Sequence, residues 1–315
     1  MSRSTSAFAI SIVALVGAVN GSCTPVTAGP SCFQRSNPSL PTAEKVRNYL
    51  SNGEEGRRIY DAVNEGDVAA VEELVRSNPR LLETHRVLAD GEVSSDGNTG
   101  GLLTFAVARC DAQMVGALLD LGADPDGIPA GNPLIYALLA DDMLMATMLL
   151  QAGASPDARP QAGQGDGTTP LREVLYYKRA DAVELLVKAG ADVNHADAIG
   201  TTPLLAAIRF EDYESAQALI EGGANPWLVS NKGALPAARL MEPSQDEKQE
   251  PLRRALLDQV KAKAASWPPP STQEIVEKFA SGQWPTPAMK QAGFVASPGA
   301  VKSIKQVAKA SGKAR

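Results

Sequence analysis

Residues 200–224 read GTTPLLAAIRFEDYESAQALIEGGA, and this stretch decides the fold of the chain. Thr202-Pro203 opens a first helix, because the fixed φ of proline suits the first helical position. A tight turn at Glu211-Asp212 leads into a second helix, which Gly222-Gly223 ends, since glycine adopts a left-handed conformation at little cost. Two helices this short cannot bury their apolar faces alone, so the stretch predicts neighbouring units of the same kind.

Three preceding stretches, 101–123, 132–154 and 169–191, fit the same frame of 23 residues. Each has an apolar residue at the third position, an apolar pair at the eighteenth and nineteenth positions, and Gly-Ala at the end. The third-position residues in the four units are Leu103, Leu134, Leu171 and Leu204, and the pairs begin at Leu118, Leu149, Leu186 and Leu219. The closing glycines are Gly122, Gly153, Gly190 and Gly223, which are 31, 37 and 33 residues apart. This spacing predicts an array of stacked helix pairs.

The pattern resembles the ankyrin repeat over roughly residues 56–263. The segment Gly190-Ala-Asp-Val-Asn194, followed by Gly200-Thr-Thr-Pro-Leu204, is close to the family pattern. The resemblance implies an all-α solenoid of stacked helix-turn-helix units joined by short hairpin loops. In the family a histidine after Thr-Pro-Leu bridges neighbouring repeats, so its replacement implies lower stability here. The residues at that place are Thr104, Ile135, Arg172 and Leu205.

The chain outside the array differs in composition. Residues 1–22 contain an early basic residue and an apolar run too short for a membrane anchor, which predicts an export signal; a buried N-terminal helix is the alternative. Residues 23–41 are rich in Pro, Ser and Gly and predict a disordered spacer. We expect the repeat domain at 42–263, with about six repeats of which the first and last are degenerate. A disordered, basic, proline-containing tail follows at 264–315.

Cys23 is a candidate lipidation site. It follows Gly21-Ser22 as in a bacterial lipoprotein signal, whereas Asn20 stands where such signals have an aliphatic residue. Two outcomes stay open, namely a lipid anchor on Cys23 or plain cleavage into a periplasmic or secreted form. A disulfide between Cys23 and Cys32 is a rival use that an oxidising compartment permits.

The two ends of the array depart from the frame. Residues 57–79 form the first repeat, with Asn78 in place of the closing glycine and therefore expected in the left-handed conformation. Residues 81–99 are an insertion with turn signals, either a binding loop or a slack connector. In the last unit we expect a late second helix with Leu252 on its buried side and Arg253 on its outer side.

The segment after the array has two helix signals. Ser271-Thr-Gln-Glu274 is a capping-box pattern and predicts a short helix that docks on the last repeat. Residues 301–310 predict a weak amphipathic helix that is either a frayed, solvated tail or an attachment to an anionic membrane surface or an acidic partner. Seven basic and no acidic residues follow Glu277.

Motifs for catalysis or metal binding are missing from the sequence. Its two histidines and three cysteines lack the spacing of a zinc site, and phosphate-loop and nucleophile-elbow motifs are missing too. Cys110 falls in an inter-helix turn and is interpreted as a half-buried small residue. We therefore expect no catalytic residue, metal, cofactor or small-molecule substrate. The net charge of −6 indicates that nucleic acid is not the main partner.

The sequence instead indicates a protein-binding surface. The resemblance implies that the hairpin tips and the exposed sides of the first helices form a concave face. Tyr, Trp and Arg dominate the energetics of protein interfaces, although some of these residues could pack between repeats instead. The candidate contacts are Tyr136, Glu173, Tyr176, Tyr177, Arg209, Phe210 and Trp227.

These observations predict a non-catalytic scaffold that binds another protein in the bacterial cell envelope, as a periplasmic protein or a lipoprotein anchored through Cys23. One alternative is an immunity-like inhibitor of a secreted toxic effector. Another is an envelope assembly or structural factor that uses the basic tail on membrane or cell wall.

Overall fold

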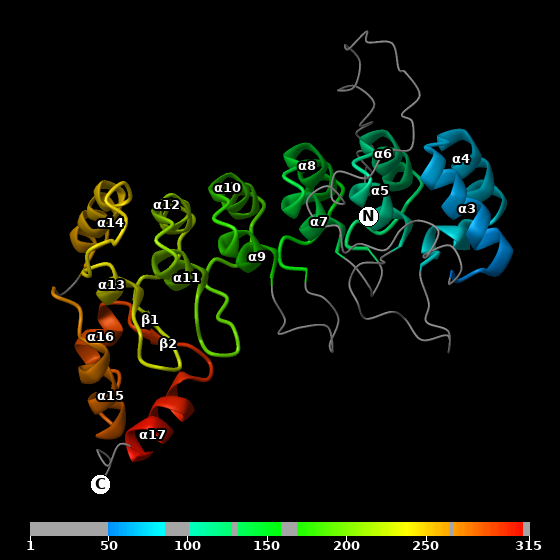
Figure 1. Cartoon of the computed structure of the whole chain (residues 1–315). Helices are drawn as coiled ribbons and strands as arrows, with labels where there is room; N and C mark the ends of the chain where they lie inside the picture. Colours follow the sequence, from blue (N-terminus) through cyan, green and yellow to red (C-terminus); the bar gives the residue numbers. More distant parts are fainter. Residues whose placement is uncertain (1–49, 86–100, 128–131, 159–168, 265–266, 311–315) are drawn as a thin grey trace, which may run out of the picture. The chain divides into compact units, whose positions relative to one another are not determined.

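The structure is a computed structural model that describes residues 50–85, 101–127, 132–158, 169–264 and 267–310 (Figure 1). The predicted export signal, the spacer with Cys23 and most of the segment 42–52 lie outside these ranges. So does the greater part of the insertion at 81–99. The expectations for these segments stay predictions.

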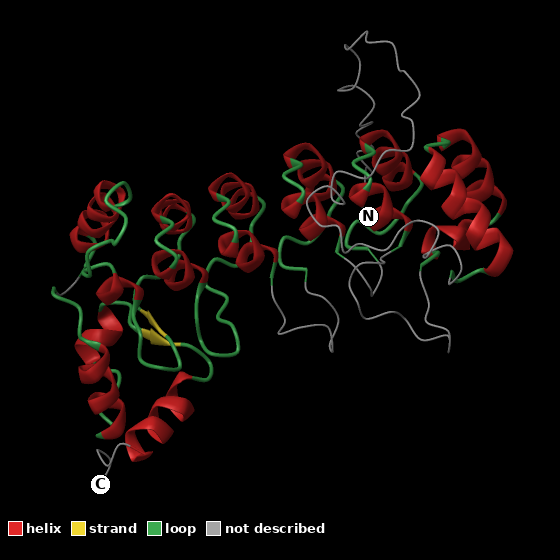
Figure 2. Cartoon of the chain, viewed as in Figure 1, coloured by secondary structure: helices red, strands yellow, loops and turns green. Residues whose placement is uncertain are grey.

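Helix pairs of one kind follow one another along the chain, and they confirm the predicted stack (Figures 1 and 2). In each of the five regular pairs the first helix contacts its own second helix and the first helix of the next pair. The regular pairs are α3 (Gly53–Glu65) with α4 (Val68–Ser77), α5 (Leu102–Ala108) with α6 (Ala112–Asp120), α7 (Pro133–Leu139) with α8 (Met143–Gln151), α9 (Pro170–Tyr176) with α10 (Ala180–Lys188), and α11 (Pro203–Arg209) with α12 (Tyr213–Glu221). An irregular sixth pair, α13 (Pro236–Arg239) with α14 (Glu250–Ala262), follows them.

The turn inside a regular pair has one left-handed residue followed by the N-cap of the second helix. At four turns that N-cap is an aspartate whose side chain accepts a hydrogen bond from the backbone N–H three residues on, which satisfies a donor the helix leaves open. The four turns are Gly66-Asp67, Cys110-Asp111, Asp141-Asp142 and Glu211-Asp212. The remaining turn, Lys178-Arg179, has no side-chain cap, and Arg179 pairs with Asp141 of the preceding unit instead.

The leucines at the end of each second helix form the predicted spine of the core. Leu118, Leu149, Leu186 and Leu219 are all 0% exposed and belong to one apolar cluster. The four closing glycines that follow have φ between 89° and 101°, as predicted for left-handed helix ends. Gly222 has a different role, because its φ is −76° and an added Cβ would lie 2.4 Å from Val187 of the preceding unit.

Asn78 does not adopt the left-handed conformation that we expected. Its backbone is extended, with φ −147° and ψ 92°. The reason is Pro79, since a proline disfavours helical backbone angles in the residue before it. The insertion therefore begins with an ordered turn, the 3₁₀ helix η2 (Pro79–Glu83), in which Leu81 is fully buried.

A ladder of side-chain hydrogen bonds links the hairpin loops between successive units. An Asp or Asn side chain of one hairpin accepts from a backbone N–H of the next. The pairs are Ser155 donating to Asp126 at 2.6 Å, Asp192 donating to Asp157 at 3.0 Å, and Asn225 donating to Asn194 at 2.7 Å. Because each bond joins residues about one repeat apart, the ladder fixes the hairpins in register, and the sequence analysis had missed it.

The expectation of a disordered C-terminal tail is wrong for residues 267–310. This segment forms α15 (Thr272–Ala280), α16 (Pro287–Gln291), β2 (Val295–Ala296) and α17 (Ala300–Ala310). The predicted capping box at Ser271 is present, and α17 packs on α15 with Ile304 fully buried. Strand β2 pairs in parallel with β1 (Leu228–Val229), which lies in the hairpin that follows α12.

An aromatic cluster holds this C-terminal segment on the last hairpin. The Trp227 and Phe294 ring centroids lie 5.0 Å apart, Phe279 and Trp284 are stacked at 4.7 Å, and Trp284 meets Phe294 at 6.0 Å. Trp227 is consequently only 7% exposed. The prediction that Trp227 is a contact residue on an open surface is therefore wrong in this structure, because the C-terminal segment covers the ring.

The last helix pair has a different register from the one we expected. Arg253 is buried and Leu252 is 39% exposed, the reverse of the prediction. The Arg253 guanidinium donates to both Glu250 carboxylate oxygens at 2.7 Å and also to the Leu240 carbonyl oxygen. These bonds satisfy the buried charge, and hydrogen bonds from Arg253, from the Ser244 backbone and from Arg254 hold the pKa of Glu250 far below its usual range.

Replacing Trp227 by alanine should release the C-terminal segment. Truncating a buried tryptophan costs about 3–5 kcal/mol, and here the loss falls on the contact with Phe294. Hydrogen exchange should show lost protection of the Val295 and Ser297 amides, which donate to the Trp227 and Val229 carbonyl oxygens. The control Tyr177→Ala removes a ring that is 54% exposed and should leave these amides protected. Equal protection in both variants would contradict this role of Trp227.

Candidate partner-binding surface

Three exposed aromatic rings lie together at the ends of α9 and α11. Tyr176 is 67% exposed, Tyr177 is 54% exposed and Phe210 is 37% exposed. The Tyr176 ring meets Tyr177 edge-on at 5.2 Å and Phe210 edge-on at 6.1 Å, measured between centroids. A cluster of exposed rings with mutual contacts is typical of a binding surface, because large apolar side chains normally leave water when a protein folds.

The repeat itself brings these rings together. Tyr177 is the C-cap of α9, and Phe210 is the C-cap of α11 in the next unit. Since α9 contacts α11, equivalent positions of the two units become neighbours, and Tyr176 meets Phe210 across the step. The predicted residues Tyr176, Tyr177 and Phe210 therefore form one exposed cluster.

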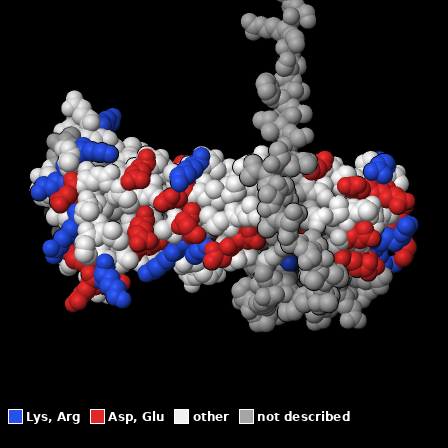
Figure 3. Space-filling model, turned by 90° about the horizontal axis from the view of Figure 1, so that it is seen from above, with Lys and Arg blue, Asp and Glu red and all other residues white. Residues whose placement is uncertain are grey.

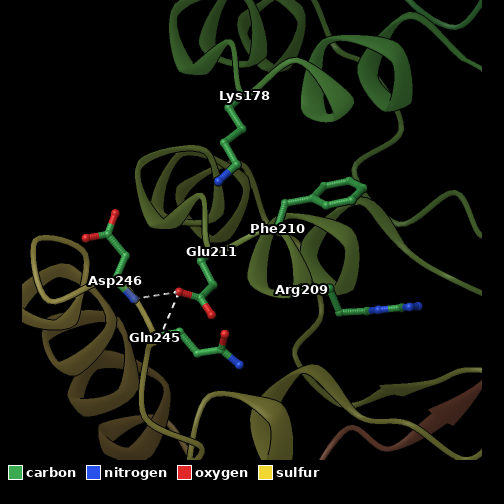
Figure 4. A pocket seen from close by; sticks show the side chains of 6 residues that line it. All are labelled: Lys178, Arg209, Phe210, Glu211, Gln245 and Asp246. Atoms are coloured by element: carbon green, nitrogen blue, oxygen red, sulfur yellow. Dashed lines mark hydrogen bonds between the residues drawn. The ribbon is translucent and has the colours of Figure 1, made fainter.

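A shallow groove of about 530 Å³ adjoins this cluster (Figure 4). It lies where the turns after α9 and α11 meet the loop before α14. In Figure 4 Arg209 and Phe210 extend to one side of their turn, whereas Glu211 extends toward the loop at Gln245 and Asp246. The lining residues are Lys178, Arg209, Phe210, Glu211, Gln245 and Asp246.

Glu211 fixes the far wall of the groove. Its carboxylate accepts hydrogen bonds from the Ser244 hydroxyl at 2.6 Å and from the backbone N–H groups of Gln245 and Asp246 at 3.0 and 3.1 Å. The bond from Ser244, followed by the two backbone bonds, lowers the pKa of Glu211 below its ordinary value. The same bonds hold the loop of the last unit against the turn, whose left-handed residue is a feature of all five regular pairs.

Two cations, Lys178 and Arg209, also line the groove. Lys178 and Arg209 are exposed and make no ion pair with any residue in the described ranges. Lys178 is a left-handed turn residue with φ 53°, and Arg209 ends α11. Both positive groups thus stand at helix C-termini, where the helix dipole favours a positive charge.

The other predicted contact residues are less exposed than the three rings. Tyr136 on α7 and Glu173 on α9 are half-buried, and Trp227 is buried under the C-terminal segment. The sequence analysis missed Lys178, Gln245 and Asp246. Because Lys178 directly follows Tyr177, the repeat frame could have predicted its place beside the rings. The positions of Gln245 and Asp246 could not be predicted in this way, because they depend on the irregular last unit.

The structure provides two further observations on chemistry. Among the residues it describes, no group of three or more His, Cys, Asp or Glu side chains is placed to hold a metal ion. Cys110 is disulfide-bonded, so its thiol is not available as a nucleophile. The alternative disulfide between Cys23 and Cys32 lies outside the described residues.

The charge on the face seen in Figure 3 is mixed. Acidic and basic side chains are interspersed over the parts of this face that are described, and neither sign covers it continuously. Within the described ranges, no helix is long and apolar enough to span a bilayer.

Residues 156–230 match a family model described as ankyrin repeats (3 copies). The matched range contains α9 to α12 and all three rings of the exposed cluster. The search of curated proteins returned no match. The ankyrin repeats are thus established for this part of the chain, and a protein-binding scaffold is the role that such repeats typically have.

Replacing Glu211 by glutamine should weaken the acid sensitivity of the fold. The folded-state pKa is lowered from the ordinary 4.5, so the carboxylate stabilises the fold above that value and this stability is lost as the pH falls through the folded pKa. Urea unfolding at pH values from about 6 down to about 3 should therefore give a shallower loss of stability for Glu211→Gln than for the wild type. Glu214→Gln, at an exposed position on α12, is the control and should keep the wild-type slope. Parallel curves for all three proteins would exclude this role of Glu211.

Proposed function

We propose that this protein is an exported, non-catalytic scaffold that binds a partner protein through the exposed cluster of Tyr176, Tyr177 and Phe210, together with Arg209. The observation that carries the proposal is the exposure of three contacting rings on a stack of ankyrin repeats. Rigid aromatic side chains and arginine contribute most of the binding energy in protein interfaces. The stacked helix pairs hold these side chains in place before the partner arrives, which reduces the entropic cost of binding.

Two features support export to the bacterial envelope. The first 22 residues have the pattern of a signal peptide. Cys110 is disulfide-bonded, and disulfides persist in oxidising compartments such as the periplasm. Lipidation of Cys23 and a disulfide at Cys23 exclude each other, because both use the same sulfur. We therefore propose an anchored form in which Cys23 carries lipid and Cys32 pairs with Cys110.

Peptide mass spectrometry without reduction tests the anchored form. In protein purified from membranes, the peptides with Cys32 and Cys110 should be linked, and the peptide starting at Cys23 should carry acyl chains. Cys23→Ser should release the protein from the membrane and leave the Cys32–Cys110 link intact. A link between Cys23 and Cys110 in wild-type protein would contradict the lipid anchor and favour simple cleavage of the signal.

Two narrower roles are compatible with this scaffold. An immunity-like inhibitor would use the exposed cluster to neutralise a secreted toxic effector, and it predicts a tight one-to-one complex. An envelope assembly factor would use the basic C-terminal segment, in which α17 exposes Lys302 and Lys305 and no acidic residue follows Glu277. The double variant Lys302→Glu/Lys305→Glu separates the two roles without removing the packed helix α17, because only the assembly factor would lose its localisation.

Replacing two of the rings tests the proposed surface. The double variant Tyr176→Ala/Phe210→Ala should lower the recovery of the partner from an envelope extract at least about tenfold, since each ring is expected to contribute more than about 1 kcal/mol. Leu144→Ala is the matched control, because Leu144 on α8 is an equally exposed apolar residue at 65%. Unchanged thermal unfolding of both variants would show that the fold is retained. Equal capture of the same proteins by wild type and double variant would refute the surface.

A further inference from the structure

We infer that the groove beside Tyr176 and Phe210 binds an acidic segment of the partner protein, one that carries an aromatic or aliphatic side chain next to one or two carboxylates. This inference rests on the proposed scaffold function and specifies the chemistry of its partner. The rings would take the apolar side chain, and Lys178 and Arg209 would take the carboxylates.

The rings supply the apolar half of the site. Tyr176 and Phe210 meet edge-on at 6.1 Å and keep much of their surface exposed to water. An apolar side chain placed against them would remove apolar surface from water on both sides, which favours binding. The two tyrosines also offer hydroxyl groups, so a segment lying across them can form hydrogen bonds while its apolar side chain is buried.

The cations supply the polar half. Several other arginines in the described ranges pair with carboxylates of the chain itself, for example Arg57 with Glu54 and Arg179 with Asp141, whereas no ion pair is seen for the exposed Arg58. Arg209 and Lys178 have no such pair although both line the groove. The planar guanidinium of Arg209 can bind a carboxylate through two parallel hydrogen bonds, which makes it the more selective of the two.

The acidic residues of the groove limit what can bind. Glu211 is held by Ser244, Gln245 and Asp246, so its carboxylate does not compete for the two cations. The charges of Glu211 and Asp246 nevertheless remain within the groove and offset those of Lys178 and Arg209. A continuous polyanion such as a nucleic acid or an anionic bilayer would meet repulsion here, whereas a segment with one or two carboxylates can place them on the cations alone.

A selection from a random twelve-residue peptide library tests the chemistry directly. With purified wild-type protein as bait, the recovered peptides should be enriched in Asp or Glu within a few positions of an aromatic or aliphatic residue. The dissociation constant of a synthetic recovered peptide should rise about tenfold or more with Arg209→Glu and should also rise with raised salt. A peptide with Lys in place of the acidic residues should regain affinity for Arg209→Glu.

The control for the charge change is Arg58→Glu, which alters an exposed arginine of α3 far along the chain from the groove. It should bind the recovered peptide within about twofold of wild type. Enrichment of peptides without carboxylates, or affinities that Arg209→Glu leaves unchanged, would overturn the inference. So would tighter binding of a twelve-nucleotide single strand than of the recovered peptides.

The same variant separates this inference from the proposed function. If wild type and Arg209→Glu capture the same partner equally well from an envelope extract, and Tyr176→Ala/Phe210→Ala does not, the surface stands and the acidic chemistry is wrong. If the wild type captures no partner protein at all, the scaffold function itself is wrong. Unfolding curves of Arg209→Glu that match the wild type ensure that lost binding does not reflect lost folding.

Discussion

The burial of leucines between successive helix pairs is the interaction on which the rest of the structure depends. Each pair is too short to form a core of its own, and Leu118, Leu149, Leu186 and Leu219 lose all contact with water only because the neighbouring pairs cover them. The same stacking sets the distance between equivalent positions of adjacent units. It thereby places neighbouring hairpins within hydrogen-bonding distance of each other. It also brings the aromatic rings at the ends of α9 and α11 into contact.

The hairpin ladder and the last hairpin use the same position in different ways. Asp126, Asp157 and Asn194 each accept a backbone N–H of the next unit, whereas the chain has Trp227 at the equivalent place. A tryptophan cannot continue the ladder. Its ring instead packs against Phe294, and its carbonyl oxygen accepts the Val295 N–H. The C-terminal segment thus packs on the hairpin at which the ladder ends, and it covers the Trp227 ring.

The repeated part of the fold could be read from the sequence because its signals are local. Proline at the helix start, an aspartate in the turn and glycine at the helix end each act within a few residues; the glycine occurs in all four units, and the proline and the aspartate each occur in three. The local frame also found Tyr176, Tyr177 and Phe210, since equivalent positions of stacked units become neighbours. The failures concern contacts between distant residues. The coverage of Trp227 depends on residues near 294, and the burial of Arg253 depends on Glu250 and the Leu240 carbonyl in an irregular unit. The predicted backbone conformation of Asn78 was wrong for a local reason, because the prediction did not consider the effect of Pro79 on the residue before it.

The parallel pairing of β1 with β2 has a consequence for the order in which the chain acquires its structure during synthesis. Contacts between neighbouring hairpins join residues about 30 positions apart, as in the 31-residue separation of Asn194 and Asn225, so each unit can settle soon after it leaves the ribosome. The Asn231 side chain, in contrast, accepts a hydrogen bond from the Ser297 hydroxyl, and Ser297 lies 66 positions downstream. The nascent stack therefore carries an uncovered tryptophan until the segment that contains Phe294 and Ser297 has been made, and this distant segment covers the ring.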